Sequence, residues 1–144
     1  MDEFSMKPPD VALRGLVLQW IDRAARDLDA AEQLGRQPDR FQYIVAFHCQ
    51  QSVEKYLKAV LVWRQIEFSK THDIRKLLNA LAMPEPQLVE ALGDADALTP
   101  FGVEGRYPGD APELLPGGER DVLAIARRVQ DGVMSRLAQY LAGG

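Results

Sequence analysis

Apolar residues recur at helical spacing through most of this chain, and no strand pattern competes with them. The first apolar stripe consists of Leu13, Val17, Trp20, Ile21, Ala24, Leu28 and Ala31. It stops at Gly35, which we expect to take the left-handed conformation that closes many helices. A second helix is predicted from about Phe41 to Trp63 or Arg64, after a polar turn over 36–40.

Two shorter stripes follow. The first consists of Ile74, Leu77, Leu78 and Leu81, and Thr71 is its predicted N-cap. Asp73 falls in the first turn of that helix, where a carboxylate suits the helix dipole. The second stripe consists of Leu88, Ala91, Leu92, Ala95 and Leu98. We expect its helix to start after Pro86 and to end before Pro100, because prolines interrupt helices.

The chain as a whole is predicted to be all-α. Prolines and glycines over 100–118 indicate a loop, and a last helix is expected from about Glu119 to Leu141. Short connections between long helices favour antiparallel neighbours. We therefore expect an up-and-down helical bundle of four long or medium helices plus one short helix. Residues 1–10 are expected to be an N-terminal tail, and 11–142 a single helical domain.

Composition narrows the class of protein. The net charge of -4 argues against broad nucleic-acid binding, although a local basic cleft stays open. Cys49 is the single cysteine, so we expect a buried thiol in a reducing compartment. The sequence has no run of 18 apolar residues and no secretory leader, so we expect a cytoplasmic protein that does not enter the membrane. Two histidines and one cysteine, with no glycine-rich phosphate loop, lead us to expect neither a metal nor a cofactor.

One side of the second helix carries the candidate chemistry. At about 100° per residue, Gln51, Lys55 and Lys58 lie about 300°, 340° and 280° from His48. The opposite arc is apolar and contains Val45, Cys49, Val53, Tyr56, Leu57 and Val60. The four polar side chains are therefore predicted to form a cationic, hydrogen-bonding face that binds a ligand. The alternative is that His48 is a half-buried histidine hydrogen-bonded to Gln51 or to a backbone group, and that both lysines are simply solvated.

Three further residues are candidates for ligand binding. His72 lies at a predicted helix start, where free backbone N–H groups attract anions. Arg106 can clamp a phosphate with its two-pronged guanidinium, and Tyr107 can stack on a base. Alternatively, the RYPG segment is a structural turn in which Arg106 pairs with an acid such as Glu104. The residues alone leave both interpretations open.

Four segments in order resemble a known family. They are the first helix with Asp27 and Leu28, then FHCQQSVEKYLKA, then THDI, and finally RYPG before the last helix. Together they are similar to the HEPN family, small helical domains named for higher eukaryotes and prokaryotes nucleotide-binding, from about Leu16 to Leu141. The resemblance implies a helical bundle, a homodimer with a cleft between its subunits and a nucleotide ligand. It also implies a partner protein, a minimal nucleotidyltransferase, in a toxin–antitoxin-like module.

One departure from the family matters for activity. Many ribonuclease members carry an arginine followed a few residues later by a histidine at the start of a late helix. No histidine follows Arg106 here, so we assign no catalytic residue. A metal-independent ribonuclease toxin using His48 or His72 with Arg106 remains an alternative. A structural dimerisation partner without a ligand is another.

Overall fold

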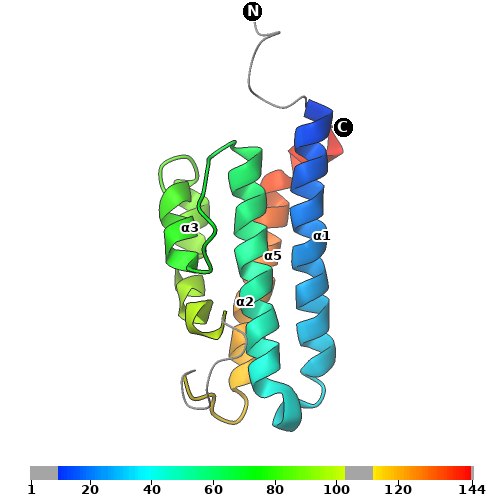
Figure 1. Ribbon diagram of the computed structural model, residues 1–144, viewed down its shortest axis with the longest axis vertical. Helices are drawn as coiled ribbons and strands as arrows, with labels where there is room; N and C mark the ends of the chain where they lie inside the picture. The colour runs from blue at the N-terminus through cyan, green and yellow to red at the C-terminus, as the bar shows by residue number, and fades with distance from the viewer. Residues whose placement is uncertain (1–9, 103–111, 144) are drawn as a thin grey trace, which may run out of the picture.

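The structure is a bundle of helices, seen in a computed structural model that describes residues 10–102 and 112–143 (Figure 1). Its elements are α1 (Asp10–Leu34), α2 (Pro38–Trp63), α3 (Ile74–Leu81), α4 (Pro86–Ala91), the 3₁₀ helix η1 (Gly93–Phe101) and α5 (Gly118–Ala142). The described residues contain no strand, which confirms the all-α prediction. None of these helices combines the length and the apolar character that a membrane crossing would need.

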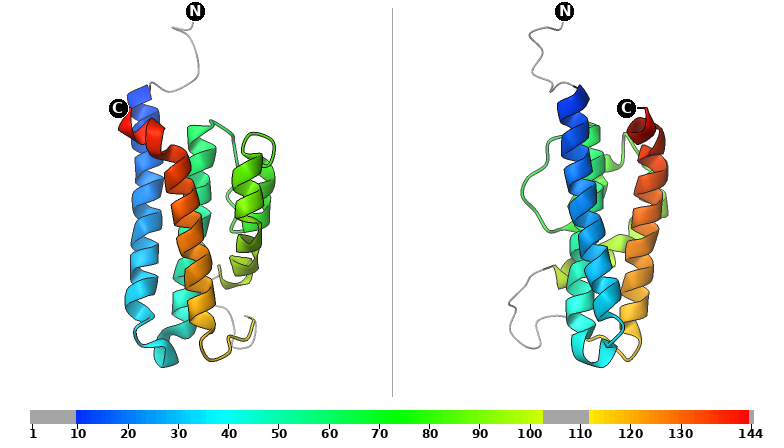
Figure 2. Two further views of the ribbon diagram at one scale, coloured as in Figure 1. Left: turned by 180° about the vertical axis from the view of Figure 1, so that it is seen from behind. Right: turned by 90° about the vertical axis from the view of Figure 1, so that its right-hand side faces the viewer.

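Three long helices form the centre of the molecule. α1 runs antiparallel to α2 and α5, while α3, α4 and η1 form a side layer (Figure 2). α2 packs against α1, α3, η1 and α5. Its predicted apolar arc is confirmed as core, because Val45, Cys49, Val53, Tyr56, Leu57 and Val60 are all buried. The remaining side of α2 faces away from α5 and is free to carry polar chemistry.

The end of α1 differs from the prediction. Among the described residues, positive φ angles occur only at Gln65 and Gly117, so the expected left-handed Gly35 is wrong. The Gly35 N–H instead bonds to the Ala31 carbonyl at 2.8 Å. A Cβ at position 35 would lie 3.1 Å from that oxygen and 3.3 Å from Leu123 Cδ1. Glycine is therefore needed here for close packing on α5, and not for its freedom to adopt positive φ.

Two helix starts also differ. α2 begins at Pro38, inside the predicted polar turn, since proline suits a first turn that needs no N–H donor. Thr71 is not the N-cap of α3. That cap is Asp73, whose Oδ1 accepts from the Arg75 N–H at 3.0 Å. Thr71 Oγ1 instead accepts from the Asp73 N–H at 3.1 Å, so it supports the turn before the helix.

The predicted helix after Pro86 is two elements, because α4 ends at Ala91 and η1 continues through Pro100. The break falls at Gly93, a poor helix former, whose carbonyl accepts from Arg75 Nη2 at 2.8 Å. Side chains three apart align in a 3₁₀ helix. Ala95 and Leu98 are accordingly both buried in η1.

Candidate functional site

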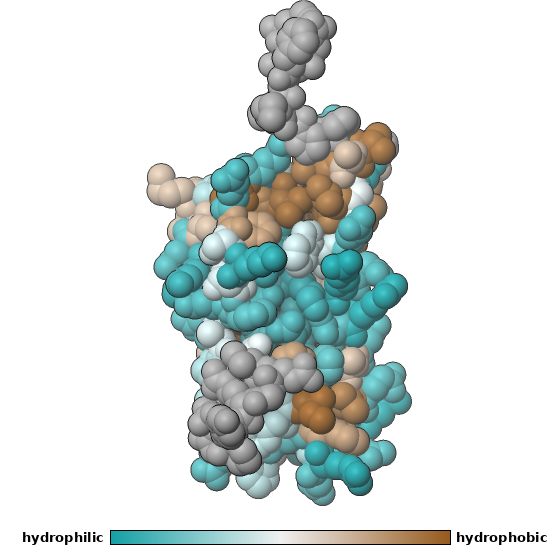
Figure 3. All heavy atoms as spheres, in the orientation of Figure 1, coloured by the Kyte–Doolittle hydropathy of each residue, from teal (hydrophilic) through white to brown (hydrophobic). Residues whose placement is uncertain are grey.

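The candidate site lies on the face formed by α1, α2 and the link 65–73. The link descends from the top of α2 on the side of α3 in Figure 1. Figure 3 shows the same face as a polar band across the middle, with apolar side chains above and below it. Two carboxylates organise this band, Asp27 from α1 and Glu54 from α2.

Asp27 joins the two polar residues of α2 that lie nearest to α1. His48 Nδ1 donates to Asp27 Oδ1 at 2.9 Å, and Lys55 Nζ donates to Asp27 Oδ2. His48 and Lys55 lie two turns apart on one side of α2, so a single carboxylate can reach both. Burial alone would raise the pKa of Asp27, but the hydrogen bonds from His48 and Lys55 outweigh it and hold that pKa below its ordinary value.

Glu54 forms a second cluster with the link 65–73. Its Oε2 accepts from Lys58 Nζ at 3.0 Å, and its Oε1 accepts from His72 Nδ1 at 2.8 Å. Lys58 is only 7% exposed, and its ammonium lies 5.5 Å and 5.7 Å from the ring centroids of Trp20 and Phe68. Lys58 therefore lies inside the molecule and not on an open cationic face. Its charge neutralises Glu54 and holds the link in place.

Gln50 connects these parts, although sequence reasoning selected only its neighbour Gln51. The fully buried Gln50 amide donates to the His72 carbonyl at 3.0 Å and accepts from Gln51 Nε2 at 2.7 Å. A Cβ at Gly102 would lie 2.6 Å from Gln50 Cδ, so the chain passes directly over this amide. A glutamine on the core side of α2 was the available signal, because a buried amide needs partners.

The two histidines are held in the same way. A carboxylate can only accept, so both rings carry their hydrogen on Nδ1. The side chains of His48 and His72 are 28% and 63% exposed, and within the described ranges no residue bonds to Nε2 of either ring. Each imidazole is therefore fixed through Nδ1 by an acid, and its Nε2 is left without a partner among the described residues. This arrangement lets a ring carry a positive charge or move a proton.

A family model for the HEPN domain matches residues 17–134. The chain belongs to the HEPN family. Comparison with curated proteins and with solved structures gave no match. Membership supports a function related to nucleotides or RNA in general. The match spans both histidine–carboxylate pairs of this HEPN domain.

The charge on the HEPN face differs from the cationic face predicted from sequence. Asp27 balances Lys55, and Glu54 balances Lys58, so the cluster gains net positive charge only when an imidazole takes up a proton. Sequence reasoning missed both acids as site residues. The spacing of Glu54 and Lys58, four apart on one helix, was a signal for the second pair.

Two predicted site residues of this HEPN domain, Arg106 and Tyr107, lie outside the described residues. In the described part of the chain, no three His, Cys, Asp or Glu side chains are grouped closely enough to hold a metal ion. What the described geometry offers is two hydrogen-bond donors, Lys55 Nζ and Gln51 Nε2, and beside them the imidazoles of His48 and His72, whose Nε2 atoms donate only when the ring is protonated. These donors suit an anionic group such as a phosphate.

Proposed function

We propose that this HEPN domain binds a nucleotide, or another phosphate-bearing group, on the face around Asp27 and Glu54. His48, Lys55 and His72 supply the charge, and Gln51 supplies an amide. The observation that carries the proposal is the pair of partly exposed imidazoles whose Nδ1 atoms are fixed by Asp27 and Glu54, while Nε2 has no partner among the described residues. That orientation is prepared before a ligand arrives, which lowers the entropic cost of binding.

Protonation controls the strength of this site. With neutral imidazoles, the two lysines and two carboxylates cancel. A proton on either ring adds a positive charge and turns Nε2 into a donor, and a donor of that kind makes a stronger bond to phosphate.

The family resemblance supports a partner for this site. We propose that the protein acts as partner subunit of a minimal nucleotidyltransferase, in a toxin–antitoxin-like module. On this proposal Arg106 and Tyr107 close the site from the 103–111 segment. On this proposal, both proteins contact the bound nucleotide.

The same face supports a homodimer. Ile44 is 45% exposed one turn before His48, and Leu16 is 44% exposed about three turns before Asp27 on α1. These apolar side chains lie toward opposite ends of the polar band, because α1 and α2 are antiparallel. A two-fold axis through the band would set the apolar end of one copy against the apolar end of the other.

Calorimetry with ATP tests the ligand proposal. We expect Lys55→Ala and His48→Gln each to weaken ATP binding about tenfold, the loss of one charge-assisted hydrogen bond. Lys76→Ala is the matched control, because Lys76 is an exposed lysine on α3 and pairs with neither Asp27 nor Glu54. Equal affinity in all four proteins would refute the proposal.

A ribonuclease is the second candidate, because two acid-backed imidazoles can act as general base and general acid. Incubation with total RNA separates it from simple binding. Cleavage that disappears in both His48→Gln and Arg106→Ala would favour the ribonuclease. Neither binding nor cleavage, in a protein that elutes as a stable dimer, would favour a purely structural partner.

A further inference from the structure

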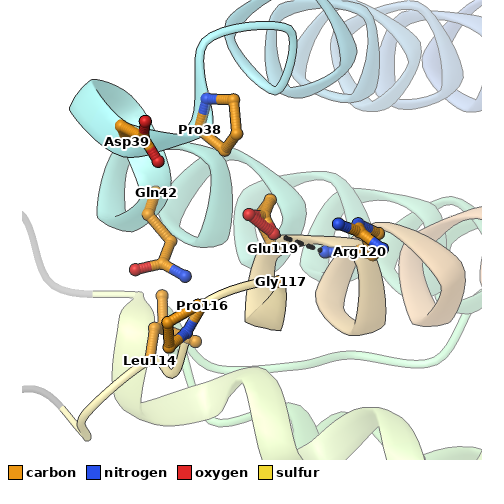
Figure 4. A pocket seen from close by; sticks show the side chains of 8 residues that line it. All are labelled: Pro38, Asp39, Gln42, Leu114, Pro116, Gly117, Glu119 and Arg120. Carbon is orange, nitrogen blue, oxygen red and sulfur yellow. Dashed lines mark hydrogen bonds between the residues drawn. The ribbon is translucent and has the colours of Figure 1, made fainter.

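A hollow of about 430 Å³ lies at the end of the bundle where α2 and α5 begin (Figure 4). It is lined by Pro38, Asp39, Gln42, Leu114, Pro116, Gly117, Glu119 and Arg120. None of these residues belongs to the face around Asp27 and Glu54. Along α2, Gln42 precedes His48 by about 9 Å. The hollow is therefore separate from the proposed phosphate site.

Glu119 is the unusual residue in this hollow. It is only 4% exposed, and the described residues give its carboxylate one hydrogen bond, at 3.2 Å from the Arg120 backbone N–H to Oε2. The other two buried acids, Glu54 and Glu85, both pair with cationic side chains. Glu119 lies in the first turn of α5, where the helix dipole favours a carboxylate, but among the described residues no cationic side chain pairs with it. Glu119 lines the hollow, so a ligand placed there can supply a partner for its carboxylate.

The walls of the hollow are held in place. Gln42 Nε2 donates to the Leu115 carbonyl at 2.6 Å, and the Leu114 N–H donates to the Tyr43 hydroxyl at 3.1 Å. Gly117, with φ of 85°, then turns the chain into α5. Two hydrogen bonds and a glycine turn thus fix the segment that carries Pro116 opposite Pro38.

We propose that the hollow binds a planar group with two neighbouring N–H donors, and that Glu119 accepts both. A carboxylate matches that geometry with two parallel hydrogen bonds. Pro38 and Pro116 provide apolar surface for the flat body of the ligand, and the volume is that of a small-molecule site. A guanidinium or amidinium carries this donor pair, and so does the base-pairing edge of guanine. Asp39 at the rim favours the cationic form of the ligand, and Arg120 opposes it.

Amide ¹H–¹⁵N NMR titrations of the whole chain test the proposal with benzamidine and with guanosine. Guanosine has no phosphate, so it does not compete for the face around His48. We expect at least one of the two to give saturable shifts at residues 38–42 and 114–120. Benzamidine alone would identify an amidinium or guanidinium as the ligand, and guanosine alone would identify a base. Adenosine, whose edge places a donor beside an acceptor, should not bind.

Glu119→Gln keeps the shape of the side chain but replaces one acceptor with a donor, so it should weaken the binding at least tenfold. Glu113→Gln is the control, since Glu113 is exposed and does not line the hollow. If Glu119→Gln fails to fold, Asp39→Asn serves instead, because Asp39 is exposed, and it should weaken benzamidine several-fold. Saturable shifts confined to other residues, equal binding by adenosine, unchanged affinity in the variant, or no shift with either probe would overturn the proposal.

Discussion

Three acids in the described residues, Asp27, Glu54 and Glu85, each pair with two basic side chains, in two different ways. Glu85, before α4, is bound by Arg64 Nε at 2.8 Å and by Arg136 Nε at 2.6 Å. The two guanidinium carbons lie 4.9 Å and 4.7 Å from the Trp63 ring centroid. Asp27 and Glu54, by contrast, each pair with one lysine and one histidine.

The difference lies in whether the charge of the partner can change. Arginine stays protonated throughout the physiological range, so the ion pairs of Glu85 connect α2, α5 and the start of α4 at every physiological pH. Burial alone would raise the pKa of Glu85, but the hydrogen bonds from Arg136 and Arg64 outweigh it and keep that pKa low. Histidine exists in a neutral and a charged form, so the charge around Asp27 and Glu54 is not fixed in the same way.

The largest expected effect is the loss of stability on removing the Glu85 carboxylate. Glu85→Ala leaves two guanidinium groups without their carboxylate and should lower the free energy of unfolding by roughly 3 kcal/mol, the lower end for a broken buried pair. Both arginines keep some exposure to water, which limits the cost. Urea unfolding followed by circular dichroism measures it. Glu90→Ala, at an exposed position of α4, should change stability by less than about 0.5 kcal/mol.

Gly102→Ala tests how tightly the chain passes over Gln50. The new Cβ would lie 2.6 Å from Gln50 Cδ, so the amide or the backbone must move. We expect a loss of about 1–3 kcal/mol, as for other overpacked sites, together with weaker ATP binding. The matched control is Gly15→Ala in α1, where a Cβ meets nothing within 4 Å. That control should stabilise the protein by up to about 1 kcal/mol, and a similar gain at position 102 would contradict the packing described here.

Asp27→Asn removes the charge that Lys55 and His48 share, and should cost about 1–2 kcal/mol at pH 7. The folded-state pKa of Asp27 is lowered, so its contribution is present above the unfolded pKa of about 4 and is lost as pH falls below it. The difference in unfolding free energy between the wild type and the variant should therefore be steady from pH 7 to about pH 5 and shrink toward pH 3. A difference that stays constant over the whole range would show that Asp27 is not held as an anion.

The smallest effect concerns Cys49, on the core side of α2. Burial raises the pKa of its thiol to about 12, so almost no thiolate forms at pH 8. Iodoacetamide should modify the native protein very slowly and the urea-unfolded protein quickly, because the thiolate is the reactive form. Mass spectrometry follows the reaction. Equal rates in both states would mean that the core side of α2 opens readily.

Most of the fold could be predicted from sequence because apolar stripes at helical spacing identify the core directly. The element ends could not, since they depend on contacts between distant elements. Gly35 is set by Leu123 of α5, and the break at Gly93 involves Arg75 of α3. Neither contact can be recognised from the spacing of apolar residues in the segments that make it.

The candidate site, like the fold, could be predicted from sequence only in part. Helical spacing identified the side of α2 that carries His48, Gln51 and Lys55. It could not identify Asp27, which lies on another helix, or the burial of Lys58 between rings from α1 and the link. Pairing between elements decides which charges on the stripe are neutralised. The stripe alone therefore overstated how cationic the face is.

The most direct test of the proposed function is a long-range ¹H–¹⁵N NMR spectrum of the two imidazoles, recorded with increasing ATP. The account predicts that ATP shifts the Nε2 resonances of His48 and His72 saturably, and that Lys55→Ala weakens the effect. Unmoved Nε2 resonances in both rings, at millimolar ATP, would contradict it.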